Sequence, residues 1–317
     1  MSKPFIVVTG EPRSGTSFLV RALNLCGMYV GGLDEMLSSE ILPNSSNLRG
    51  AWESKTLHEV NFFQEGELTE DQKQALKDLI SRLMARPSLA AGLKLLLKKL
   101  PEVIDLLPEH TIFIGIFRHP LKVAESRVRA YGEAEGNYEK WIRRWKVNNE
   151  RLLDILSKHG GFLINFDWPK EKLLKEVCYV AERVGLIPIN LESWYSEELR
   201  HSDLTYKYIS LPEDVKQVYE RLCERAEKNH EITISIPPLN HDWREIVKTL
   251  LEENAEMGRA VYDFMRERAR GLYREYDRIY GVMIAGGVFY LIVAKAVDLH
   301  IRLKRGRFKR IYRLLIK

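Results

Sequence analysis

Residues 5–18 read FIVVTGEPRSGTSF: an apolar run, a glycine-bounded loop and the start of an apolar-periodic segment. This order predicts a buried strand, a phosphate-binding loop and a helix. Gly10 and Gly15 let the backbone turn tightly and present consecutive N–H groups. A helix that begins near Thr16 would point the positive end of its dipole into the loop. The stretch therefore predicts an anion-binding site.

The loop has the Gly-x4-Gly-Thr-Ser spacing of a P-loop, but Thr16 stands where that loop has a lysine. That lysine normally reaches the β- and γ-phosphates and stabilises the transferred phosphoryl group. Arg13 is the only cation within the loop sequence. The spacing therefore argues against ATP hydrolysis and ordinary kinase chemistry, and it indicates a different phosphate-containing donor.

A second motif follows about a hundred residues later, where residues 112–126 read IFIGIFRHPLKVAES. It predicts a buried strand, then Arg118 at its C-terminal end, a turn with proline, and Ser126 in the next helix. Two strand-to-helix junctions of this kind predict an α/β fold with a central, mostly parallel sheet. Both motifs would then lie at the C-terminal ends of their strands.

Together the two motifs resemble those of sulfotransferases that use 3′-phosphoadenylyl sulfate (PAPS), and the resemblance to bacterial and carbohydrate-type members covers about residues 4–205. It implies a P-loop-like sulfotransferase fold with helices on both faces of the sheet. It also implies that Arg118 and Ser126 bind the 3′-phosphate, and that Phe18 lies against the adenine unless it only packs in the core. The residues implied for the 5′-phosphosulfate are Arg13, Ser14, Gly15, Thr16 and Ser17.

Residues 47–53, NLRGAWE, resemble the Asn-x-x-Gly-aromatic-Glu element of the same sulfotransferases, which implies that Glu53 is the general base. An acceptor hydroxyl must lose its proton as its oxygen attacks sulfur, so a nearby carboxylate suits the chemistry. The alternative is that Glu53 only favours the dipole of the helix that follows it.

Lys94 lies inside the apolar segment 90–95, and burying a lysine is costly unless an anion meets it. The resemblance implies that Lys94 contacts the leaving phosphosulfate and, with Arg13, balances the charge that develops on the bridging oxygen. Members with a histidine base carry it two residues after this lysine, but Leu96 occupies that position here. This departure leaves Glu53 as the expected base.

Composition predicts a globular chain, with 317 residues of which 45% are hydrophobic. The three cysteines are widely spaced and fit neither a disulfide framework nor a metal site. The first strand begins within five residues of Met1, which leaves no room for a secretory signal. We therefore expect a cytoplasmic protein that needs no metal and binds no nucleic acid.

The C-terminal part departs from the rest in charge and hydropathy. We expect a helical extension over residues 206–280, then an apolar run and a basic tail over residues 281–317. The apolar run, residues 281–294, is fourteen residues long, short of the roughly twenty that span a bilayer. Residues 302–317 carry eight basic and no acidic side chains. They predict attachment to an anionic membrane at its inner face, unless the run is core or a homodimer interface.

These features predict sulfuryl transfer from PAPS to an acceptor hydroxyl, with a carbohydrate or lipid acceptor favoured over other small molecules. Two other classes stay open. A P-loop phosphotransferase or kinase would need a lysine in place of Thr16 and an acidic residue where β-strand 112–117 is followed by Arg118. A non-catalytic, membrane-associated nucleotide-binding module would keep the phosphate motifs but would not need Glu53.

Overall fold

The computed structural model describes residues 3–32, 35–37, 52–64, 66–131, 138–192, 194–195, 210–234 and 236. Several expectations lie outside these residues. They concern the Asn47 end of the element that contains Glu53, the part of the helical extension beyond residue 236, and the apolar run and basic tail over residues 281–317.

The described strands form one five-stranded sheet in the order β2-β3-β1-β4-β5, and every pairing between them is parallel. The strands are β1 (Phe5–Gly10), β2 (Met28–Tyr29), β3 (Ala90–Leu96), β4 (Thr111–Phe117) and β5 (Phe162–Asn165). Their side chains are almost all buried, as expected for a parallel sheet with helices on both faces. The α/β class with a parallel central sheet is therefore confirmed.

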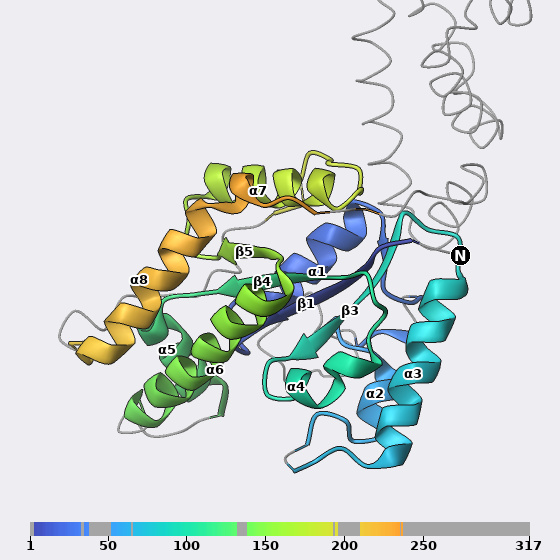
Figure 1. Ribbon diagram of the computed structural model, residues 1–317. Coiled ribbons are helices and arrows are strands. Elements are labelled where there is room, and N and C mark those ends of the chain that lie inside the picture. Colours follow the sequence, from blue (N-terminus) through green and yellow to red (C-terminus); the bar gives the residue numbers. More distant parts are fainter. Residues whose placement is uncertain are drawn as a thin grey trace, which may run out of the picture.

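Helices cover both faces of the sheet (Figure 1). Helices α6 and α8 pack on one face, beside α5, while α1 and α7 pack on the other and α3 lies against β3. The longer helices are α1 (Thr16–Leu25), α3 (Glu70–Ala85), α5 (Pro120–Tyr131), α6 (Tyr138–His159), α7 (Lys170–Arg183) and α8 (Glu213–Glu227). Short helical segments are α2 (Lys55–Glu59), α4 (Leu100–Val103), η2 (Ile104–Leu106) and η5 (Asn229–Glu231).

Local sequence signals account for several of these boundaries. Helix α3 begins after Thr69, whose side chain accepts a hydrogen bond from the Gln72 backbone N–H while the Gln72 side chain accepts from the Thr69 N–H. This reciprocal capping satisfies two backbone donors that the first helical turn leaves open. In α6 the apolar positions recur at helical spacing, and one stripe including Trp141, Trp145 and Leu152 is buried.

The sheet order brings the two motifs next to each other. Because β3, β1 and β4 are adjacent and parallel, the segments that follow all three strands lie at one edge of the sheet. At the end of β1, a Cβ on Gly10 would lie 2.3 Å from the Ile116 carbonyl oxygen of β4, so only glycine allows this close approach. The edge where β1 and β4 end is thus where a ligand site is expected.

Helix α8, which follows the predicted boundary at residue 205, packs against β5 and α6 through its buried residues Val215, Val218 and Leu222. The division into domains remains a prediction. Among the residues that the structure describes, no helix has the length and apolar character to cross a membrane.

Candidate active site

The phosphate-binding loop, residues 11–15, joins β1 to α1 in a tight turn. The Ser14 N–H donates to the Glu11 carbonyl oxygen at 3.0 Å. Arg13 and Gly15 both have positive φ, of 78° and 92°. A side chain on Gly15 would also lie 2.6 Å from the Phe166 ring, so glycine is required there for two reasons. Arg13 adopts its positive φ at an energetic cost, as residues at functional sites often do.

The loop has the features of an anion site. Helix α1 begins at Thr16, its N-cap Gly15 makes no side-chain cap, and its first turn has no acidic residue, so the positive end of the helix dipole carries no negative side chain of its own. The Ser14 hydroxyl is buried and has no hydrogen-bond partner among the described residues. Because a buried, unpaired hydroxyl is costly, its position beside a helix N-terminus fits an anion that accepts from it. These features fit the anionic group of a ligand.

A hydrogen bond joins the two predicted motifs directly. The Arg13 side chain, from the loop after β1, donates through Nε to the Ser126 hydroxyl on α5 at 2.8 Å. These two residues are 113 positions apart in the chain. The residues predicted to bind the two phosphate groups of one nucleotide are therefore neighbours.

Arg118 lies at the C-terminal end of β4, as the sequence predicted, and its side chain is buried. Its backbone carbonyl accepts a hydrogen bond from the Trp145 indole at 2.9 Å, which ties the strand end to α6. Its guanidinium lies over the Phe166 ring, 5.6 Å from the ring centroid. Its Nε lies 3.5 Å from the Asp167 carboxylate.

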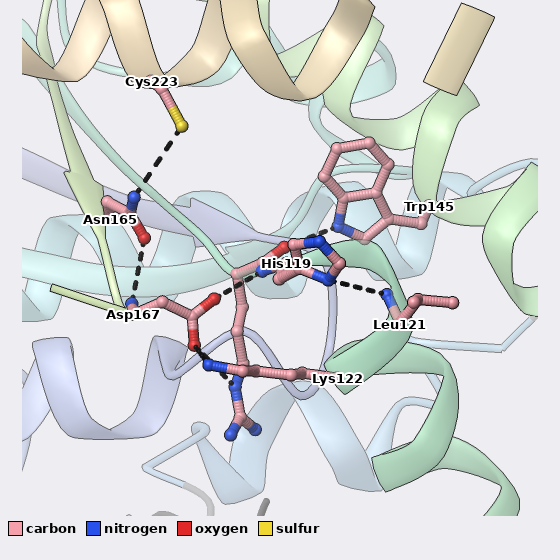
Figure 2. Close-up of polar contacts among 8 residues, drawn as sticks. His119, Leu121, Lys122, Trp145, Asn165, Asp167 and Cys223 are labelled. Carbon is pink, nitrogen blue, oxygen red and sulfur yellow. Dashed lines mark hydrogen bonds and ion pairs between the residues drawn. The ribbon is translucent and has the colours of Figure 1, made fainter. Parts of the chain in front are cut away.

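Asp167, just beyond β5, is a site residue that the sequence analysis did not single out. Figure 2 shows its carboxylate between the backbone N–H of His119 and the ammonium of Lys122. The distances are 2.6 Å to the His119 nitrogen and 2.8 Å to Lys122 Nζ. Asp167 thus joins two cations, Arg118 and Lys122, at the edge of the sheet. The available signal in the sequence was its place two residues after the apolar strand Phe162–Asn165.

The predicted base and the predicted leaving-group lysine form an ion pair. Lys94 Nζ lies 2.6 Å from Glu53 Oε1 and 3.3 Å from the Ser17 hydroxyl of α1. The other oxygen of Glu53, Oε2, lies 2.7 Å from His58 Nε2. Burial by itself would raise the pKa of Glu53, but Lys94 and His58 outweigh it and lower that pKa from 4.5 to about 2. Glu53 is therefore an ionised carboxylate at neutral pH.

Glu53 is positioned at the site by backbone contacts with residues 36–37, which its local sequence does not indicate. Met36 and Ser54 form an isolated antiparallel bridge, and the Leu37 N–H donates to the Glu53 carbonyl oxygen at 2.9 Å. Trp52 has a positive φ of 52° and lies under the Arg21 guanidinium, 4.5 Å from the ring centroid. These contacts hold Glu53 beside β3 and the N-terminus of α1.

Glu11, the first residue of the loop, belongs to a buried network of charged and polar side chains from α5 and α6. The Glu11 carboxylate accepts hydrogen bonds from Arg127 of α5 and from Asn148 of α6, and Arg144 Nε lies 3.8 Å from it. Arg127 also lies over the Trp141 ring, 4.6 Å from its centroid. Because Glu11 and Arg127 are both almost fully buried, the pair must stay together, and it fixes the loop relative to α5 and α6.

Phe18 belongs to an aromatic cluster beside the loop. Its ring is stacked on Trp194 with centroids 5.6 Å apart, and it contacts Phe166 and Tyr195 at 5.4 and 5.8 Å. The ring is partly buried and packs on the core. Its predicted contact with an adenine remains a prediction.

The structure thus brings five of the predicted residues into two contacting groups. Arg13 and Ser126 form one, and Ser17, Lys94 and Glu53 form the other. Across the described residues there is no cluster of three or more histidine, cysteine or acidic side chains suited to hold a metal ion.

Comparisons with known proteins find similarity only at the level of solved structures. No model of a known protein family matches the chain, and no curated protein does. Among solved structures, the fold is similar to the "Sulfotransferase Domain from the Synechococcus PCC 7002 Olefin Synthase", with a TM-score of 0.38 and 16% sequence identity. The match covers 70% of this chain and 95% of that domain. At this level the similarity does not extend to activity or substrate.

Proposed function

We propose that this protein transfers a sulfuryl group from PAPS to an acceptor hydroxyl. The observation that carries the proposal is the position of the Lys94 ammonium, 2.6 Å from the Glu53 carboxylate and 3.3 Å from the Ser17 hydroxyl. One cation thereby stands between a candidate base and the first turn of α1, which follows the loop that would hold the donor. A module that only binds nucleotide has no need of this carboxylate.

The donor would be held at both of its phosphate ends. The N–H groups of the loop and of the first turn of α1, with the Ser14 hydroxyl, suit the 5′-phosphosulfate. Arg118 and Ser126 suit the 3′-phosphate, and Arg13 stands between the two ends because it donates to Ser126. Phe18 lies beside the loop, where it suits the adenine.

In the reaction, PAPS supplies a sulfuryl group whose bond to the phosphate oxygen breaks as the acceptor oxygen bonds to sulfur. Lys94 and Arg13 stabilise the negative charge that develops on the leaving oxygen. Glu53 takes the proton that the acceptor hydroxyl loses. As the Lys94 ammonium turns from Glu53 toward the leaving oxygen, the carboxylate loses its counter-charge and becomes a stronger base.

A P-loop phosphotransferase is not favoured, because Thr16 stands at the lysine position and Arg118 follows the strand β4 where an acidic residue would be needed. The resemblance to carbohydrate-type sulfotransferases favours a sugar or lipid acceptor. Because the acceptor itself is not identified, the activity should be tested on a mixture of possible acceptors.

The test is transfer of labelled sulfate from PAPS to a cell lysate that is afterwards separated into polysaccharide, lipid and protein. We expect label in the polysaccharide or lipid fraction with the wild-type protein and almost none with Glu53→Gln. Adenosine 3′,5′-bisphosphate should also raise the melting temperature far more than ATP with Mg²⁺, since ligand at a hundredfold over its Kd adds about 2.7 kcal/mol. Equal stabilisation by the two nucleotides, with no label in any fraction, would refute the proposal.

A further inference from the structure

The cluster around Asp167 contains a cation, Lys122, in addition to Arg118 and Ser126, the two predicted ligands of the 3′-phosphate. Lys122 of α5 lies 2.8 Å from Asp167 Oδ1, and Arg118 Nε lies 3.5 Å from the same oxygen. Figure 2 shows Lys122 and the Asp167 carboxylate pointing at each other from α5 and from the end of β5. A single carboxylate therefore holds two cations at one point.

Lys122 stands on the same side of α5 as Ser126. The two residues are four positions apart, so their side chains lie one above the other along the helix. Ser126 accepts the hydrogen bond from Arg13, which places this side of α5 against the phosphate-binding loop. Arg118 directly precedes the helix. In the sequence Lys122 therefore lies between the arginine and the serine that are proposed to bind the 3′-phosphate, and through Asp167 it shares a carboxylate with that arginine.

Asp167 does not use up the binding capacity of this lysine. An ammonium group has three donors, and Asp167 takes one of them. The carboxylate itself is engaged on the other side, since Oδ2 accepts the His119 N–H at 2.6 Å. The side chain of Lys122 is 24% exposed, whereas that of Arg118 is 6% exposed, so Lys122 is the more accessible cation.

We propose that Lys122 is a further ligand of the 3′-phosphate, held in position by Asp167, and that it contributes to the choice of a 3′-phosphorylated nucleotide. The inference rests on the proposed function, because it needs a nucleotide with phosphates at both ends. A phosphate group has enough negative charge and enough oxygen acceptors to bind a guanidinium and an ammonium at the same time. Asp167 acts as a positioning residue.

The experiment measures, by calorimetry, the Kd of two nucleotides that differ only in the 3′-phosphate: adenosine 3′,5′-bisphosphate and adenosine 5′-monophosphate. Lys122→Met removes the charge and keeps most of the side-chain length. We expect it to weaken binding of the bisphosphate about tenfold, which corresponds to about 1.4 kcal/mol. Binding of the monophosphate should stay within about twofold of wild type.

Two further variants control for folding and for overall charge. Lys122→Arg keeps the charge and should restore most of the preference for the bisphosphate. Lys216→Met removes a lysine that pairs with Glu213 on α8, and it should change neither Kd. Because both nucleotides are measured on each variant, a general loss of structure would lower both affinities and would count against the inference.

The outcomes separate this inference from the proposed function. If the wild-type protein does not prefer the bisphosphate at all, the proposed nucleotide is wrong. If Arg118→Ala abolishes the preference while Lys122→Met keeps it in full, the nucleotide stands and Lys122 is not a ligand. Equal weakening of both nucleotides by Lys122→Met would also overturn the inference.

Discussion

At the scale of single residues, Glu53 shows how the surroundings of a side chain decide its chemistry. Its two oxygens meet a buried lysine and a half-exposed histidine, Lys94 and His58. An isolated glutamate before a short helix would only favour the helix dipole. The ion pair with Lys94 is a contact that the dipole role does not require, and the role of Glu53 as the base remains a prediction.

Glu53→Gln should therefore separate catalysis from binding. Glutamine keeps the shape of the side chain but cannot take the proton of an acceptor hydroxyl. We expect affinity for adenosine 3′,5′-bisphosphate to stay near wild type and kcat to fall by roughly 10² to 10⁴. Glu59→Gln, at an exposed position at the end of α2, is the matched control and should leave kcat unchanged. Full turnover by Glu53→Gln would move the base elsewhere, with His58 the next residue to replace.

The same carboxylate should make stability depend on pH. The pKa of Glu53 is lowered from 4.5 to about 2, so its ionised form stabilises the fold above about pH 4.5. This stabilisation, at most about 3 kcal/mol, is lost as the pH falls from about 4.5 toward 2. Urea unfolding across this range should show the wild-type advantage over Glu53→Gln shrinking as the pH decreases. A difference in unfolding free energy between the two proteins that stays constant with pH would show that ionisation of Glu53 is not its cause.

At the scale of elements, the phosphate-binding loop is held by its own conformation and by its neighbours. Gly15 supplies a positive φ at the start of α1, and Phe166 of the β5 end fills the space beside it. Behind the loop, Glu11 joins it to α5 and α6 through Arg127 and Asn148. The loop is thus fixed before any ligand binds, which favours binding because little ordering is needed.

Gly15→Ala tests the contact with Phe166, and the protein offers a matched control in Gly66→Ala. Both glycines have positive φ, 92° and 104°, but a Cβ on Gly66 meets no atom within 4 Å. Gly66→Ala should lower the unfolding free energy by about 1 kcal/mol, because alanine disfavours a positive φ. Gly15→Ala should cost about 1 to 3 kcal/mol more and should also weaken binding of the bisphosphate. Equal losses in urea unfolding would show that the Phe166 contact is unimportant.

At the scale of the whole molecule, charge is unevenly distributed along the chain. Residues 265–317 carry fourteen Lys and Arg against four Asp and Glu, whereas the whole chain has a net charge of +5. The predicted site residues lie between Arg13 and Ser126, well before this basic region. The sequence therefore separates the predicted chemistry from the predicted membrane attachment.

Truncation after Tyr280 should test that separation. Basic residues near an anionic surface each contribute about 1 kcal/mol of attraction, so eight of them in residues 302–317 should suffice for binding. We expect the full chain to co-sediment with anionic liposomes at low salt, and the truncated chain to remain soluble and active without co-sedimenting. Misfolding or a changed oligomeric state of the truncated chain would instead indicate a core or dimer role for the apolar run.

The sequence by itself determined the strands β1 and β4, the helices that follow them, and the position of each motif at the C-terminal end of its strand. The apolar runs of β1 and β4, the glycines of the loop and the position of Arg118 all follow from local preferences. So does the capping of α3 by Thr69. These features depend on the backbone conformations of a few adjacent residues, so a single stretch of sequence is enough to predict them.

Only the tertiary structure decided which of these ends are neighbours. The strand order β2-β3-β1-β4-β5 places Lys94 beside Ser17 and Glu53, and it brings Asp167 to Arg118 and Lys122. Partners such as Glu11 and Arg127 are 116 positions apart. Their pairing follows from the packing of α5 beside the loop that carries Glu11. A buried charge of this kind is tolerated because an opposite charge lies against it.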